Sequence, residues 1–358
     1  MARRVGILTG GGDAPGLNAV IRGFTRHAVK NLDRTVVGVM DSFNGLMDKP
    51  RRLMPLTPLA VRGLLHRGGT LIGTTNRGDP FAWREGTARV DRSEALAQAV
   101  RDEGLEGLVV VGGDGTQAIA WRLMQERGVP VIGVPKTIDN DLGATDVTFG
   151  FQSAVDVATE ALDRLHTTAE SHERILILEV MGRDAGHIAL HAGLSGGADV
   201  ILIPEIVWEA RHVAAAIAAR RPIGRTYTLV VVAEGSLPGE TSTMGAEQKA
   251  RLRAGGGAGA IVAAQLEGAV NAEVRVCVLG HLQRGGSPTP ADRLLATRFG
   301  VAAADLVAQG RWGDMVRLRN GSVEPVSLAS AIAQNRGVDV HGELVRTARA
   351  LGIHFGDR

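Results

Sequence analysis

The stretch VVVGGDGT, Val109 to Thr116, ends an apolar run and leads into a helical pattern, QAIAWRLMQERG. It predicts a buried strand, a glycine turn and a helix that begins directly after the turn. The helix N-terminus would present unpaired N–H groups and a partial positive charge, which suit a phosphate. The carboxylate of Asp114 would suit Mg²⁺, a cation that prefers oxygen ligands. Taken alone, the motif is also explained by a tight turn with one solvated aspartate.

Strand-like and helix-like runs alternate along the rest of the chain. The strand-like runs are continuously apolar, which is typical of parallel strands buried on both faces. They are TVVGVM (35–40), GLVVVG (107–112), PVIGVP (130–135), RILILEV (174–180), VILIP (200–204), YTLVVVAEG (227–235) and VRVCVLG (274–280). A chain of 358 residues exceeds the size at which one core stops growing. We therefore expect an α/β fold with two similar doubly wound, mainly parallel-sheet domains.

The composition excludes several classes of protein. Forty basic residues stand against 38 acidic ones and aromatic residues make up only 3%, so we expect no nucleic-acid partner. No apolar stretch reaches about 18 residues, so we expect no membrane span and a cytoplasmic location. The single cysteine, Cys277, excludes a disulfide within the chain. Its apolar surroundings predict a small buried side chain.

Two other stretches carry chemistry-bearing residues. In PKTIDNDL (135–142), Asp139 and Asp141 follow a strand. One carboxylate could take a proton from a hydroxyl while the other helps to hold a metal, although an Asp-rich turn explains them as well. In TGGGDAPGLNAVIRG (9–23), three glycines allow a phosphate to approach backbone amides. Their spacing departs from the dinucleotide-binding pattern, so NAD binding is only a weak alternative.

Seven motifs together resemble the 6-phosphofructokinase family, in the same order and at the same spacing. They are TGGGDAPGLNAVIRG, GGDGT, PKTIDND, EVMGR (179–183), PE (204–205), AEG (233–235) and GHLQRGGSP (280–288). The resemblance covers nearly the whole chain. It implies a nucleotide- and Mg²⁺-binding domain, residues 1–150 plus 284–333, and a sugar-phosphate-binding domain, residues 151–283 plus 334–358. The implied reaction is phosphoryl transfer from ATP to the 1-hydroxyl of D-fructose 6-phosphate, which gives fructose 1,6-bisphosphate and ADP in glycolysis.

The resemblance also implies roles for single residues. Asp139 would be the base, Thr137 would position the hydroxyl, Arg183 would stabilise the transferring group, and Asp141 would assist Asp114, the Mg²⁺ ligand. The expected ATP-side residues are Gly11, Gly12, Arg77, Gly112, Gly113, Asp114, Gly115, Thr116 and Lys136. The expected sugar-side residues are Thr137, Asp139, Arg174, Met181, Gly182, Arg183, Glu234, Arg275, His281 and Arg284.

Two of these arginines imply an oligomer. In the family, the arginines that Arg174 and Arg275 match reach across a subunit interface to the 6-phosphate. The resemblance therefore implies a homodimer or homotetramer whose active sites are completed by a neighbouring subunit.

The phosphoryl donor depends on two positions. Gly115 is typical of family members that use ATP, because an aspartate there would repel the nucleotide's α-phosphate. Lys136 is typical of members that use pyrophosphate. Glycine together with lysine resembles a mixed subgroup found among ATP-dependent enzymes, so ATP is the expected donor and a pyrophosphate-dependent enzyme is the alternative. A non-catalytic sugar-phosphate or nucleotide sensor is a third hypothesis, but a sensor has no need of the base Asp139.

Overall fold

The computed structural model describes residues 3–220, 222, 224–239, 247, 256–333 and 335–358. The chain divides into two compact units. Unit 1 comprises Met1–Ile138, Leu142–Gln152 and Arg284–Asn335, and unit 2 comprises Asp139–Asp141, Ser153–Gln283 and Arg336–Arg358. Residues 139–141 thus pack with unit 2 although the chain on both sides of them belongs to unit 1. The ligand roles expected for the two domains stay predictions.

Unit 1 is built on an eight-stranded, mainly parallel sheet, in the order β14-β13-β7-β6-β1-β2-β3 with β8 paired to β7. Its strands are β1 (Arg3–Thr9), β2 (Arg34–Val39), β3 (Leu53–Leu56), β6 (Leu105–Gly112), β7 (Val131–Thr137), β8 (Phe149–Gly150), β13 (Asp314–Arg319) and β14 (Ser322–Ser327). Only the edge strands β3 and β14 run antiparallel to their neighbours. The predicted fold class is confirmed. The two edges were not predicted, because β3 (LMPL) is short and contains a proline and β14 (SVEPVS) has no continuous apolar run.

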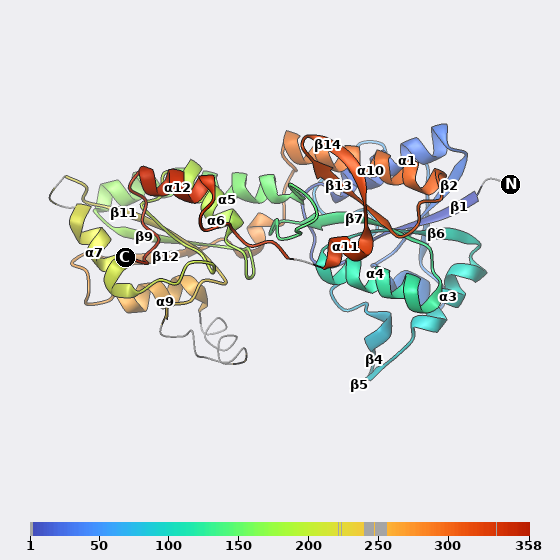
Figure 1. Cartoon of the computed structure of the whole chain (residues 1–358), viewed down its shortest axis with the longest axis horizontal. Coiled ribbons are helices and arrows are strands. Elements are labelled where there is room, and N and C mark those ends of the chain that lie inside the picture. Colours follow the sequence, from blue (N-terminus) through green and yellow to red (C-terminus); the bar gives the residue numbers. More distant parts are fainter. Residues whose placement is uncertain (1–2, 221, 223, 240–246, 248–255, 334) are drawn as a thin grey trace. The chain divides into compact units, whose positions relative to one another are not determined.

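Helices cover both faces of this sheet (Figure 1). They are α1 (Leu17–Asn31), α2 (Asn44–Met47), α3 (Ser93–Asp102), α4 (Asp114–Arg127), α10 (Pro290–Ala308) and α11 (Leu328–Ile332). In β6, Val109 and Val111 join the core beneath α1 and α10, whereas Leu108 and Val110 join the core beneath α3 and α4. Because successive strand residues point to opposite faces, both faces of β6 are apolar. A separate antiparallel pair, β4 (Trp83–Glu85) and β5 (Ala88–Val90), follows the 3-10 helix η1 (Pro80–Ala82).

Unit 2 contains a fully parallel four-stranded sheet, in the order β10-β11-β9-β12. Its strands are β9 (Ile175–Val180), β10 (Val200–Leu202), β11 (Thr228–Ala233) and β12 (Val274–Val278). The helices α7 (Ala210–Arg220) and α9 (Gly257–Leu266) cover one face, and α5 (Phe151–His172), α6 (His187–Ser195) and α12 (Glu343–Ala350) lie on the other (Figure 1). The 3-10 helix η4 (Gly280–Gln283) follows β12. None of the helices within the described ranges is both long and apolar enough to span a lipid bilayer.

The edge strand β12 exposes apolar side chains. Val276 is 37% exposed and Val278 is 52% exposed. Cys277 between them is also exposed, so the prediction of a buried cysteine is wrong. An apolar run predicts burial only where other elements cover the strand, and β12 has a neighbouring strand on one side alone.

Helices α1 and α10 approach each other closely at a glycine. A Cβ atom on Gly300 would lie 2.5 Å from the carbonyl oxygen of Val20 and 2.8 Å from the amide nitrogen of Phe24. Both atoms belong to the α1 backbone, which cannot move aside as a flexible side chain would. The packing of this face of the sheet therefore depends on the missing side chain.

We expect Gly300→Ala to lower the free energy of unfolding by about 1–3 kcal/mol, because the methyl group forces α10 away from α1. Urea denaturation monitored by circular dichroism measures this. Gly115→Ala is the matched control, since a Cβ there has no atom within 4 Å. Alanine in that helix should stabilise by about 0.5–1 kcal/mol. Equal stability of Gly300→Ala and the wild type would contradict the packing argument.

Candidate active site

Two glycine turns meet at the carboxyl ends of neighbouring strands in unit 1. They follow β1 and β6, and the Gly10 N–H donates to the Val111 carbonyl at 2.9 Å. Thr116 of α4 lies against both turns. A Cβ on Gly10 would stand 2.6 Å from Thr116 Cγ2, and one on Gly112 would stand 2.5 Å from Thr116 Cβ. The two glycines therefore allow the first turn of α4 to approach β1, at the edge where parallel sheets bind ligands.

The N-terminus of α4 remains open to a ligand. Helix α4 begins at Asp114, and Gly113 before it has no side chain with which to cap the first amides. Asp114 is half-buried and Gly115 is exposed. An anion at this position would meet helix N–H groups and the positive end of the helix dipole.

Lys136 brings a buried positive charge to the first glycine turn. It is only 4% exposed, near the end of β7, and its Nζ donates to the Gly12 carbonyl. A Cβ on Gly11 would lie 3.3 Å from Lys136 Nζ, 3.5 Å from Thr116 Oγ1 and 3.9 Å from Asn76 Oδ1. Gly11 thus faces polar atoms from three segments, a composition that suits a phosphate.

Two arginines of unit 1 that were expected to bind ligands, Arg77 and Arg284, differ in their surroundings. The Arg77 side chain is exposed, and Asn76 rather than Arg77 lies beside Gly11. Arg284, expected on the sugar side, donates from Nη1 to the Asp13 carbonyl at 3.0 Å and packs on Gly12. Its guanidinium therefore adjoins the first glycine turn.

Gln117 is a supporting residue that the sequence analysis missed. Its fully buried Nε2 donates to the carbonyls of Val110 (3.1 Å), Gly112 (3.1 Å) and Val134 (2.9 Å). One amide group therefore ties α4 to the ends of β6 and β7. The sequence signal that could have identified Gln117 is a polar residue on the face of α4 that packs on the sheet.

In unit 2, the expected base lies next to the expected arginine. Asp139 is 3% exposed, and its Oδ2 lies 3.9 Å from Arg183 Nε. The Arg183 side chain is 60% exposed, so its guanidinium remains accessible to a ligand. A buried carboxylate beside an accessible guanidinium can accept a proton and stabilise developing negative charge.

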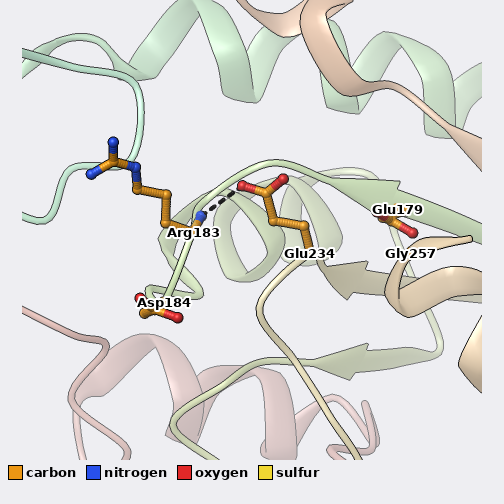
Figure 2. Close-up of a pocket in the computed structure, with 5 residues that line it drawn as sticks. All are labelled: Glu179, Arg183, Asp184, Glu234 and Gly257. Atoms are coloured by element: carbon orange, nitrogen blue, oxygen red, sulfur yellow. Dashed lines mark hydrogen bonds between the residues drawn. The ribbon is translucent and has the colours of Figure 1, made fainter. Parts of the chain in front are cut away.

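Side chains from distant segments hold the backbone around Arg183. Arg183 adopts a left-handed conformation, φ 52°, and its N–H donates to Glu234 Oε1 at 2.9 Å. Figure 2 shows this bond, with the Arg183 side chain extending away from Glu234. The Met181 N–H donates to Gln283 Oε1 at 2.8 Å. Glu234, expected as a sugar contact, thus also supports the loop, and Gln283 is a second supporting residue that the sequence analysis missed.

A cavity of about 440 Å³ adjoins this loop, within the range of small-molecule sites. Glu179, Arg183, Asp184, Glu234 and Gly257 line it (Figure 2). Arg183 and Glu234 were predicted as ligands, whereas Glu179 and Asp184 were not assigned a role. Burial raises the pKa of Glu179, against the lowering effect of the hydrogen bond that its carboxylate accepts from the Gly259 N–H at 2.8 Å. Carboxylates beside one arginine suit the hydroxyl groups of a sugar.

Of the ten expected sugar-side residues, Arg183 and Glu234 line this cavity and the other eight do not, among them His281 and the arginines Arg174 and Arg275. Both arginines pair with the same carboxylate, that of Glu273. His281 is exposed in η4. Within the described ranges, no group of three or more His, Cys, Asp or Glu side chains is arranged to hold a metal ion.

A family model described as Phosphofructokinase matches residues 4–307. The chain belongs to the phosphofructokinase family. A relative from Chloroflexus aurantiacus named ATP-dependent 6-phosphofructokinase is 51% identical over 357 residues, which cover 99% of this chain and 98% of the relative. A relative from Streptomyces coelicolor named pyrophosphate–fructose 6-phosphate 1-phosphotransferase is 47% identical over 361 residues, which cover 99% of this chain and all of the relative.

The solved phosphofructokinase from Saccharomyces cerevisiae has the same fold. It matches with a TM-score of 0.78 and 30% identity over 92% of this chain. The match covers 45% of the longer yeast chain.

In this member of the phosphofructokinase family, a buried histidine follows Arg183 by four positions in the sequence. His187 begins α6, is 8% exposed, and its Nε2 is 3.1 Å from the Arg336 carbonyl. The pKa of His187 is lowered to about 4, mainly by burial, which outweighs the raising effect of the hydrogen bond to the Arg336 carbonyl; the nearby charge of Arg336 acts in the same direction as burial. The folded protein therefore keeps this imidazole neutral across most of the acidic range.

This pKa predicts acid destabilisation in a defined window. Between pH 6.5 and pH 4 the unfolded chain takes up a proton at His187 that the folded chain does not, so stability falls as the pH falls. The loss should total about 3 kcal/mol and end below pH 4. His187→Gln, which keeps a donor, should show a shallower decline in urea-unfolding free energy. Parallel pH profiles of the two proteins would contradict the burial of a neutral imidazole.

Proposed function

We propose that this protein transfers a phosphoryl group from ATP to the 1-hydroxyl of D-fructose 6-phosphate, in the cytoplasm. The observation that carries the proposal is the buried carboxylate of Asp139, 3.9 Å from the accessible guanidinium of Arg183, in a chain of the phosphofructokinase family. Asp139 would accept the proton of the attacking hydroxyl. Arg183 would stabilise negative charge on the group in transfer.

The residues of unit 1 fit a magnesium-bound phosphate donor. Asp114, at the start of α4, would hold Mg²⁺ together with phosphate oxygens and water. Mg²⁺ commonly takes only one or two protein carboxylates in sites where it also binds phosphates. When bound, the ion neutralises charge on the phosphates. The amides of α4 and the Lys136 ammonium would hold the phosphate oxygens.

The choice of ATP over pyrophosphate rests on Gly115. This residue is exposed, and a Cβ there has no atom within 4 Å, so the space beside the α4 N-terminus is open. Relatives at similar overall identity carry either donor in their names, so overall identity does not separate the two. Lys136, which favours pyrophosphate, donates to the Gly12 carbonyl and so has a structural role as well.

We expect the unaltered protein to form fructose 1,6-bisphosphate faster with ATP than with pyrophosphate in a coupled assay. Gly115→Asp should lower kcat/KM for ATP by about 10-fold to 100-fold, because the carboxylate repels the donor phosphates. Gly115→Ala is the control for bulk without charge and should stay close to the wild type. Turnover with pyrophosphate alone would overturn the proposed donor, and unchanged ATP kinetics in Gly115→Asp would overturn the charge argument.

We further propose that the exposed side of β12 contacts a second copy of this chain. Val276 and Val278 of β12 are exposed, and Leu282 of the following helix η4 is 69% exposed. Arg174 and Arg275 lie at the same edge, both paired with Glu273. Apolar groups beside two arginines fit an interface at which one subunit supplies positive charge to the sugar phosphate of its neighbour.

Mixing two inactive variants tests this sharing. Asp139→Asn and Arg275→Ala should each lose most activity alone at low acceptor concentration. In dimers refolded from an equal mixture, about a quarter of the sites pair an intact Asp139 with a partner's intact Arg275, and activity should recover accordingly. A mixture of Asp139→Asn with the double variant is the control and should stay inactive. No recovery in the first mixture would show that Arg275 serves its own subunit or none.

A further inference from the structure

Arg336 binds the turn that carries the proposed base. Its backbone N–H donates to the Asp141 carbonyl at 2.7 Å, and its Nη2 donates to the Asn140 carbonyl at 3.2 Å. Asn140 lies in the left-handed region, φ 54°, which non-glycine residues seldom adopt. Two hydrogen bonds from one residue therefore hold a turn whose conformation is unfavourable by itself.

The same C-terminal segment is anchored to the end of the Arg183 loop. The Arg336 carbonyl pairs with His187 Nε2, and the Val338 N–H donates to Glu205 Oε1 at 2.7 Å. Glu205 also accepts the Gly186 N–H, at 3.0 and 3.1 Å from its two oxygens. Residues 336–338 therefore connect the Asp139–Asp141 turn with the segment that follows Arg183.

These contacts explain why residues 139–141 pack with unit 2. The Asp139–Asp141 turn and the segment that follows Arg183 come from separate parts of the chain, and residues 336–338 hydrogen-bond to the turn and adjoin that segment through His187 and Glu205. We propose that Arg336 is a positioning residue, which sets the placement of Asp139 relative to Arg183 through the backbone of Asn140 and Asp141. This inference rests on the proposed function of Asp139 as base.

The guanidinium suits this role better than other side chains. It is half-buried, always charged, and presents several donors in a fixed plane, so a carbonyl can be held in one direction. Lysine would keep the charge and an N–H donor group, glutamine would keep only a neutral donor group, and methionine would keep neither. The three substitutions therefore remove the charge and the hydrogen-bond donor of Arg336 in steps.

The experiment compares Arg336→Lys, Arg336→Gln and Arg336→Met with the wild type in the coupled assay. We expect kcat to fall by about 10-fold to 100-fold in the two neutral variants while KM for both substrates stays within about twofold, because misplacing the base slows chemistry more than binding. Arg336→Lys should retain a larger share of kcat. The matched control is Arg346→Gln, which removes an exposed arginine that donates to the His341 carbonyl at 2.9 Å. It should keep wild-type kinetics.

Each outcome has a defined meaning. Unchanged kcat in folded Arg336→Gln or Arg336→Met overturns the inference, and so does a rise in KM without a fall in kcat. Failure of both neutral variants to fold, judged by circular dichroism, would make Arg336 a structural residue and would also overturn it. Absence of turnover by the wild type contradicts the proposed function itself, which separates the two failures.

Discussion

The contact of Thr116 with two glycine turns is the constraint on which the geometry of the unit 1 site depends. Parallel strands buried on both faces leave polar groups only at their ends, so ligand chemistry must be built from the turns that follow them. Thr116 packs against Gly10 and Gly112 and brings the α4 N-terminus beside the first turn. Gln117, one residue further, fixes the strand ends below it. Any side chain on either glycine would separate the helix from the turn.

Unit 2 uses a different principle, in which polar side chains hold an irregular backbone. The Arg183 amide donates a hydrogen bond to Glu234, and the Met181 amide donates one to Gln283. The Gly186 amide donates one to Glu205. Each acceptor comes from a different segment, so the loop conformation depends on the tertiary fold and not on local preference. The accessible guanidinium of Arg183 is thereby presented on a backbone that is held at Met181, Arg183 and Gly186.

The sequence predicted the parallel strands and the residues that follow them, because apolar runs and glycine turns are local signals. It did not predict Arg336 or Gln283, because their partners lie more than a hundred positions away and nothing in their own surroundings distinguishes them. Cys277 was misjudged for a related reason: an apolar run does not reveal whether its strand lies at a sheet edge. The roles proposed for Arg174 and Arg275 involve a second subunit, which one chain does not contain.

Gly115 has an evolutionary consequence. Because a side chain there meets no neighbouring atom, the position tolerates substitution without repacking any part of the fold. A single base change can convert a glycine codon into an aspartate codon. If the proposed function holds, one substitution at this position could therefore change the phosphoryl donor of a lineage without passing through a protein that folds poorly. Such a short path fits the relatives of this chain. Some of them are named for ATP and one is named for pyrophosphate, yet each shares about half of its residues with this chain.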